Sequence, residues 1–290
     1  MQLGKLGVWA FCDEMTSPQW ADFARRVEGA GYGSLWINEA FGRNALVASG
    51  WLLANTQELV VATGIANIYG RDPLAMVSAQ VGLAEQSGGR FLLGIGVSHA
   101  PLVKDLRGHE YGKPVATMHA YLEAMAKVQT TIPSPPEKPR TVLAALGPKM
   151  LELSRDMADG AHPYNTTPEH TKIARGILGP GKLLCVEQKV LSETDPVKAR
   201  AIGRAHLKGY LALPAYRNNW LRLGFDESDF AGDCSDRLID ATFAWGGDEA
   251  VAERVDAHLR AGADHVCIQL LGPSPVPDIA ELERLAKVLT

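Results

Sequence analysis

The sequence predicts one α/β domain over residues 1–290, a (β/α)8 TIM barrel with insertions after its fourth and seventh strands. Eight short apolar segments, rich in branched residues, alternate with segments of helical periodicity along the chain. Such apolar runs are typical of parallel strands that are buried on both faces. We expect no second apolar core, because the eight strand–helix units use all of the apolar segments.

Start and stop signals place these elements in order. The clearest unit is residues 59–101, in which a strand, a polar loop, a helix that begins after Asp72-Pro73, a second strand and a second polar loop follow one another. The predicted strands cover residues 6–10, 34–38, 59–63, 91–96, 141–146, 160–163, 183–190 and 266–270. Helices are predicted to begin at Ser17-Pro18 and to cover residues 45–55, 149–158, 196–213, 237–245, 248–259 and 277–289.

Two regions exceed what a barrel unit needs. The polar segment 99–114 follows strand four, and we expect it to form a lid. Residues 195–245 follow strand seven and are too long for one barrel helix. Residues 133–139 (PSPPEKP) are predicted to be a stiff, exposed connection.

Composition excludes several classes of protein. The chain is 46% hydrophobic and 21% charged, with a net charge of -4, so we expect neither nucleic acid nor a membrane as a partner. No signal-peptide pattern or membrane-spanning run is evident, and a cytoplasmic location is expected. The four cysteines lack metal-ligand spacing and are expected to be buried, reduced thiols: Cys12, Cys185, Cys234 and Cys267.

In a TIM barrel the active site is built from residues that follow the strands. Those residues here are Trp9, Phe11, Glu39, Gly64, Ala66, Asn67, Ser98, His99, Gly147, Lys149, His162, Tyr164, Asn165 and Thr166. They lack the spacing of metal ligands, and no serine or cysteine lies on a sharp strand-to-helix turn. Glycine-rich and amide-rich backbone beside aromatic residues would instead suit a flat, hydrogen-bonding ring.

Two backbone segments allow two interpretations each. Gly64-Ile65 either forms a bulge that brings backbone towards a ligand or only ends its strand. Gly147-Pro148-Lys149 either offers a helix N-terminus and an ammonium group to a phosphate or only begins a helix.

Two ionisable side chains also allow two interpretations each. His99 either exchanges a proton near neutral pH or is a structural loop histidine. Glu39 either balances a donor of the ligand or forms an ion pair with Arg43 or Arg71.

Five segments, LWINEAFGR, VATGIANIYGRDP, GGRFLLGIGVSHAPLV, LRGHEYGKP and ADGAHPY, occur in this order. Together they resemble the bacterial luciferase-like monooxygenase superfamily, and within it the branch of coenzyme F420 (deazaflavin)-dependent oxidoreductases. The likeness covers nearly the whole chain. It is strongest over residues 34–164 and weakest over residues 195–245.

The resemblance implies a cofactor ring over the C-terminal mouth of the barrel, backed by a non-prolyl cis peptide at Gly64-Ile65. The residues expected to hold the cofactor are Glu39, Thr63, Gly64, Ile65, Ala66, Asn67, Ser98, Gly147, Lys149 and His162, with Gly147 and Lys149 near the phosphate. The expected catalytic residues are His99 and Glu39, and the expected substrate-facing residues are Trp9, Arg107 and Tyr164. Some relatives carry a histidine after the strand-two acid, where this chain has Ala40, so their proton relay does not transfer whole.

The resemblance therefore implies hydride transfer between coenzyme F420 and a small organic substrate, with His99 as acid or base. One alternative is an FMN-dependent monooxygenase that uses reduced flavin and oxygen. A second is a barrel that binds a flavin-like ligand without catalysis. A homodimer is expected from the habit of the family.

Overall fold

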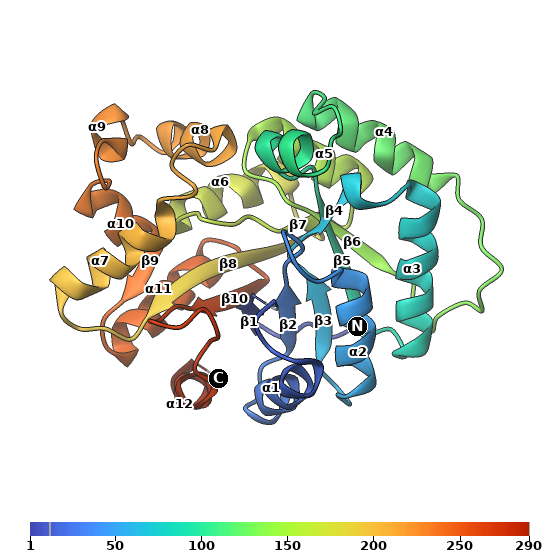
Figure 1. The fold of residues 1–290 in the computed structure, drawn as a ribbon, viewed down its shortest axis with the longest axis horizontal. Helices are drawn as coiled ribbons and strands as arrows, with labels where there is room; N and C mark the ends of the chain where they lie inside the picture. The colour runs from blue at the N-terminus through green and yellow to red at the C-terminus, as the bar shows by residue number, and fades with distance from the viewer. Residues whose placement is uncertain (12, 290) are drawn as a thin grey trace.

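The computed structural model describes residues 1–11 and 13–289, and its centre is a closed barrel of eight parallel strands (Figure 1). These strands are β1 (Leu6–Ala10), β2 (Ser34–Ile37), β3 (Val60–Thr63), β5 (Phe91–Gly96), β6 (Arg140–Leu143), β7 (Gly160–Ala161), β8 (Leu183–Leu191) and β10 (His265–Leu270). They pair in this order, and pairing between β10 and β8 and between β10 and β1 closes the barrel. The predicted TIM barrel is confirmed.

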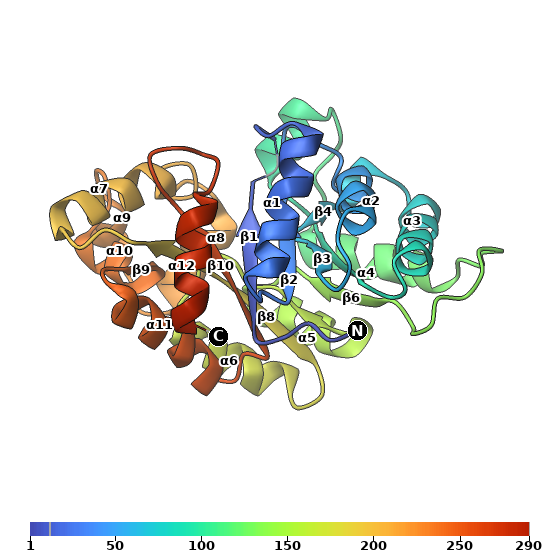
Figure 2. The same ribbon diagram turned by 90° about the horizontal axis from the view of Figure 1, so that it is seen from below.

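The barrel helices surround the strands, as the view from below shows (Figure 2). They are α1 (Ser17–Gly29), α2 (Ala45–Ala54), α3 (Pro73–Gln86), α4 (Pro114–Ala126), α5 (Pro148–Met157), α6 (Pro168–Leu178), α11 (Asp248–Arg260) and α12 (Ile279–Leu289). The predicted start signals are confirmed at α1 and α3. The Asp72 carboxylate, for example, accepts a hydrogen bond from the Ala75 amide at 2.9 Å, as expected of a residue that caps a helix.

The segment after β8 folds differently from the prediction. Its elements are α7 (Pro196–Leu207), α8 (Pro214–Arg222), α9 (Glu227–Phe230), α10 (Asp236–Thr242) and the strand β9 (Phe243–Trp245). The predicted helix 196–213 is wrong beyond Leu207, and the predicted helical segment 237–245 is wrong in its last three residues. Those three residues pair with residues 189–191 at the end of β8, because the short strand β7 pairs only with Leu183 and Leu184 and leaves the backbone groups of that edge available.

The same segment builds an apolar cluster of its own above β8. It contains Trp220, Phe230, Leu238 and Phe243, all of them buried. We expected no second apolar core. The short aromatic helices α8–α10 nevertheless bury their side chains against one another and against β8 and β9, on one side of the barrel (Figure 1).

Three further features complete the fold. The short strand β4 (Ala66–Asn67) pairs with β5, η1 (Ile68–Gly70) is a single 3₁₀ turn, and η2 (Leu102–Leu106) is a π-helical turn in the segment after β5. Cys185, Cys234 and Cys267 are buried free thiols as predicted, whereas Cys12 lies outside the described residues. Among the described residues, no helix is both long and apolar enough to span a membrane.

Candidate active site

Glu39 follows β2 and forms hydrogen bonds with three other segments of the chain. Its carboxylate accepts hydrogen bonds from the Arg71 guanidinium (Nη1–Oε2 2.9 Å) and from the backbone amides of Asn67 (2.8 Å) and Ala45 (3.2 Å). The side chains of Glu39 and Arg71 are 6% and 10% exposed, so this is a nearly buried ion pair. The pairing with Arg71 that the sequence allowed is confirmed. The contacts of Glu39 are those of a residue that positions β4 and α2.

The peptide between Gly64 and Ile65 is cis, as the resemblance implied. Trp9 Nε1 donates a hydrogen bond to the Gly64 carbonyl at 3.1 Å. A Cβ atom at Gly64 would lie 2.6 Å from Trp9 Nε1 and 2.9 Å from His162 Nε2. The chain therefore needs glycine here, because β3, β1 and β7 converge on this backbone.

The neighbours of Gly64 in sequence are held from within the barrel wall. The Thr63 hydroxyl donates to the Gly94 carbonyl (2.7 Å) and accepts from the Gly94 amide (2.9 Å). The Asn67 side chain accepts from the Tyr69 amide at 2.9 Å, and Ala66 is fully buried in β4. These contacts fix the backbone of residues 63–67 at the barrel mouth.

His162 follows β7 and lies inside the barrel. Its ring stacks on Trp36, with centroids 4.3 Å apart, and its Nδ1 donates to the Cys185 carbonyl at 2.9 Å. Burial lowers the pKa of His162 to about 4, so the imidazole is neutral at neutral pH. Its Nε2 is then an acceptor, and this buried atom has no hydrogen-bond partner among the residues that the structure describes.

Ser98 and His99 follow β5 in an unusual backbone turn. Ser98 has a φ of 55°, and its carbonyl accepts a hydrogen bond from the Tyr111 hydroxyl at 3.1 Å. His99 is half-buried, and its ring centroid lies 5.4 Å from that of Tyr216 on α8. Desolvation lowers the pKa of His99, which favours a neutral imidazole at neutral pH.

Arg107 ends η2 and lies on the β3 side of the mouth. A Cβ atom at Gly70 would lie 3.5 Å from Arg107 Nη1 and 3.9 Å from Glu39 Oε2. The Nε atom of Arg107 is buried and has no hydrogen-bond partner in residues 1–11 and 13–289. The structure thus brings Arg107 near the Glu39 cluster, whereas Tyr164, its expected companion, belongs to a different group of side chains.

Tyr164 belongs to a group of aromatic residues on the β8 and β10 side. Its hydroxyl lies 3.1 Å from the Tyr210 hydroxyl and donates to Gln269 Oε1 at 2.9 Å. Its ring centroid is 5.3 Å from that of Trp9. Two of the expected substrate-facing residues, Trp9 and Tyr164, are therefore in contact.

Sequence reasoning missed a buried ion pair beneath this group. Lys189 Nζ lies 3.1 and 3.0 Å from the two carboxylate oxygens of Glu187 and 3.7 Å from the centre of the Tyr164 ring. Burial lowers the pKa of Lys189 to about 8 and raises that of Glu187. The signal was present, because residues two apart on a strand face the same side, here the barrel interior.

Polar atoms that have no hydrogen-bond partner among the described residues lie near the ends of β6 and β7 and on the neighbouring helices α6 and α8. They are the side-chain amide of Asn165, Thr166 Oγ1, His170 Nδ1 and Asn219 Nδ2, all of them buried. In the same area, a Cβ atom at Gly147 would lie 3.5 Å from Arg222 Nη2. Lys149, the cation expected here, is exposed. Sequence reasoning overlooked Arg222 and Asn219, because both lie on α8 in the weakly patterned insertion.

The described residues do not favour a metal site. Within residues 1–11 and 13–289, no three His, Cys, Asp or Glu side chains are placed to hold a metal ion together. What converges at the mouth is a glycine backbone, neutral histidines, aromatic rings and buried hydrogen-bonding atoms. Such a site can hold a polar ring and exclude water from it.

Residues 10–176 match the family model of the luciferase-like monooxygenases. The chain belongs to this family. A similar protein is Rv3520c of Mycobacterium tuberculosis, provisionally named a coenzyme F420-dependent oxidoreductase. It is 26% identical over 99% of this chain and 90% of its own length.

Two solved enzyme structures share the fold. An F420-dependent secondary alcohol dehydrogenase, in complex with an F420-acetone adduct, superimposes with a TM-score of 0.77 at 14% identity, covering 99% of each chain. The oxygenating component of 3,6-diketocamphane monooxygenase from Pseudomonas putida, in complex with FMN, gives a TM-score of 0.71 at 13% identity, covering 99% of this chain and 98% of its own. At these identities the likeness concerns the fold.

Proposed function

We propose that the chain is a coenzyme F420-dependent oxidoreductase that transfers a hydride between the deazaflavin and a small organic substrate. The observation that carries this proposal is the group of buried polar atoms without partners at the barrel mouth. Buried polar atoms are nearly always hydrogen-bonded in native proteins, so these atoms favour a ligand with both a polar ring and a phosphate. The F420-dependent relatives support the choice of ligand.

The residues divide between the two ends of such a cofactor. The ring would lie against the Gly64-Ile65 backbone, which Trp9 and His162 pack from within the barrel, with His162 Nε2 as an acceptor for a ring N–H group. The phosphate would lie at the N-terminus of α5, beside Gly147 and Arg222, with Lys149 further out. When bound, a deazaflavin supplies or accepts the hydride.

The chain supplies the proton chemistry. Since burial keeps the His99 imidazole neutral at neutral pH, it is suited to take the proton of a substrate hydroxyl. Tyr216 covers His99 from α8, which limits access of water. In this proposal Glu39 acts through Asn67 and Arg71 as a positioning residue rather than as an acid or base.

An FMN-dependent monooxygenase is the second candidate, because the FMN-bound structure has the same fold and FMN also combines a polar ring with a phosphate. A barrel that only binds a flavin-like ligand is the third.

Titration of the purified protein with coenzyme F420 and with FMN, followed by fluorescence quenching, tests the proposal. We expect F420 to bind at least about tenfold more tightly than FMN, because the relatives of this protein include one named as F420-dependent. Tight binding of FMN without binding of F420 would overturn the proposal in favour of the monooxygenase. The non-catalytic barrel would be favoured if F420 binds but its absorbance does not change when alcohols are added to the oxidised cofactor or ketones and enones to the reduced cofactor.

A further inference from the structure

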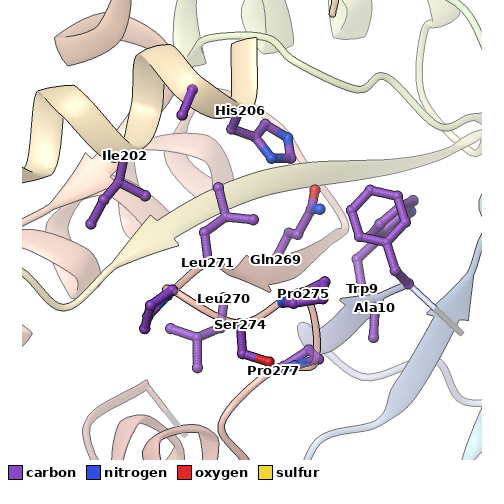
Figure 3. Close-up of a pocket in the computed structure, with 14 residues that line it drawn as sticks. Trp9, Ala10, Ile202, His206, Gln269, Leu270, Leu271, Ser274, Pro275 and Pro277 are labelled. Atoms are coloured by element: carbon purple, nitrogen blue, oxygen red, sulfur yellow. The ribbon is translucent and has the colours of Figure 1, made fainter. Parts of the chain in front are cut away.

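One pocket of the structure lies beside the proposed cofactor site. It has a volume of about 250 Å³ between the ends of β1 and β10 and the helix α7 (Figure 3). Its lining includes Trp9, Phe11, Ile202, His206, Gln269 and Leu271. Pockets for drug-sized ligands are roughly 300–1,000 Å³, so this one suits a smaller molecule.

The pocket offers one fixed hydrogen-bond donor. Gln269 is 2% exposed, and its Oε1 accepts from the Tyr164 hydroxyl at 2.9 Å. Its Nε2 is thereby left as the free end of the amide, and within residues 1–11 and 13–289 this buried donor has no partner. Figure 3 shows the amide between the rings of His206 and Trp9. A buried donor without an acceptor is costly, and a ligand oxygen would remove that cost.

His206 supplies an acceptor on the opposite wall. Its Nε2 is also buried and has no partner in the described part of the chain, and its ring stacks on Tyr210 at a centroid distance of 5.4 Å. Burial and the nearby Lys189 lower the pKa of His206 to about 3, so the ring is uncharged. None of the described residues that line the pocket is Asp, Glu, Lys or Arg. A charged ligand would lose its hydration here without gaining an ionic partner.

We propose that this pocket binds a small, uncharged, aliphatic or alicyclic ketone and the corresponding alcohol. Gln269 Nε2 donates to the ligand oxygen, and the imidazole of His206 accepts from the hydroxyl of the alcohol. Trp9 joins this pocket to the proposed cofactor site, because its ring forms one wall while its Nε1 bonds to the Gly64 carbonyl. His99, which takes the hydroxyl proton in the proposed function, is not among the described residues that line this pocket, so the ligand here occupies a binding subsite apart from the proton transfer. That the ligand is the substrate rests on the proposed function, whereas the binding itself does not.

The test measures binding of cyclohexanone to the full-length, cofactor-free protein by saturation-transfer NMR. Cyclohexanecarboxylate and cyclohexylammonium serve as charged probes of similar size. We expect cyclohexanone to bind and both charged probes to bind at least about tenfold more weakly, since neither finds an ionic partner. Equal binding of all three probes, or no binding of cyclohexanone, would overturn the proposal.

Three variants locate the site. Gln269→Leu removes the donor at similar volume and should weaken cyclohexanone binding about three- to tenfold. Ile202→Trp fills the pocket and should abolish binding. Val197→Ala, on the same helix but 76% exposed, should leave affinity unchanged. Unchanged affinity in both pocket variants contradicts the proposal.

Titration of the same variants with coenzyme F420 separates this inference from the proposed function. Wild-type protein that binds F420 but not cyclohexanone would overturn only the pocket proposal. Protein that binds cyclohexanone in an Ile202-dependent manner but ignores F420 would overturn only the proposed function. Retained F420 binding in Ile202→Trp would also show that the variant folds.

Discussion

Gly64 lies where three barrel strands converge and leave no room for a side chain. The atoms that a side chain at this position would meet first belong to Trp9, which is 2% exposed, and to His162, which is stacked on Trp36. Neither ring can move without disturbing the barrel interior, because cores are close-packed. Glycine at this position is therefore a requirement of packing before any ligand is considered.

Gly64→Ala should lower the free energy of unfolding by about 1–3 kcal/mol, the usual cost of overpacking a core. It should also weaken cofactor binding, since Trp9 and His162 must shift. Urea denaturation and fluorescence titration measure the two effects. The matched control is Gly176→Ala on the exposed face of α6, where nothing lies within 4 Å of the added Cβ. That control should be neutral or stabilise the protein by up to about 1 kcal/mol. A stable Gly64→Ala protein with full cofactor affinity would contradict this view of the site.

His99→Ala should reduce turnover by about 10²- to 10⁴-fold if the imidazole is the base, while the affinity for the cofactor changes little. Because the pKa of His99 is lowered, the rate of substrate oxidation should rise with pH below about 6.5 and be level above it. Steady-state kinetics from pH 5 to 8 measure both effects. A profile that keeps its acid limb in the variant would assign that limb to another group.

Several residue contacts follow from the sequence and others do not. The cis peptide at Gly64-Ile65 was implied by the resemblance and is confirmed. The pairing of Glu39 with Arg71 was one of two ion pairs that the sequence allowed, and only the fold decides between partners. The catalytic role of His99 stays a prediction.

At the scale of elements, α8 brings Arg222 to the N-terminus of α5. Arg222→Ala should weaken coenzyme F420 binding about 10- to 100-fold, in proportion to a charged hydrogen bond. Affinity for a deazaflavin without the phosphate should not change. Lys208→Ala is the control, because it removes an exposed cation from the same insertion. Equal losses for both ligands in Arg222→Ala would indicate a structural role instead.

The elements that the sequence predicted well share a clear physical signal. Helices with proline at their start, such as α1, α3 and α5, begin within one residue of the prediction, because Pro favours the first turn and restricts what precedes it. In the insertion, α7 also begins at Pro196 as predicted, whereas the start of α8 at Pro214 was overlooked because its helical periodicity is weak. Residues 243–245 form β9 only because the end of β8 is available to pair with them, and sequence periodicity cannot show this.

At the scale of the molecule, eight repeated strand–helix units made the barrel predictable, since each unit carries its own apolar pattern. The side chains that fill the barrel interior were harder to predict from the sequence. Glu187 and Lys189 are buried together inside the barrel, and only closure of the strands makes them interior. The homodimer stays a prediction, and the mass of the protein in solution is the measurement that tests it. The cytoplasmic location stays a prediction as well.

Burial of neutral histidines is a second property of the whole molecule. His258 is hydrogen-bonded to Thr171 and Gln188, and its pKa is lowered to about 3. His265 Nδ1 donates to the Gly4 carbonyl and its Nε2 accepts from Trp36, and its pKa is lowered to about 4. A proton on Nε2 of His265 would face the indole N–H of Trp36. Folding therefore requires these rings to stay uncharged.

Acid should destabilise the protein for this reason. Between pH 6.5 and 4 the unfolded chain binds protons that these histidines refuse in the fold, so each buried ring lowers the free energy of unfolding by up to about 1.4 kcal/mol per pH unit. Above pH 6.5 these histidines are neutral in both states, so they no longer make the free energy of unfolding depend on pH. His258→Gln should lower the free energy of unfolding at pH 7.5 but make its decrease between pH 7.5 and 5 less steep. His119→Gln, at a half-exposed position, should leave the free energy at pH 7.5 and its decrease unchanged. Urea unfolding at pH 7.5, 6 and 5 measures the slopes, and an unchanged slope in His258→Gln would place the acid sensitivity among the carboxylates instead.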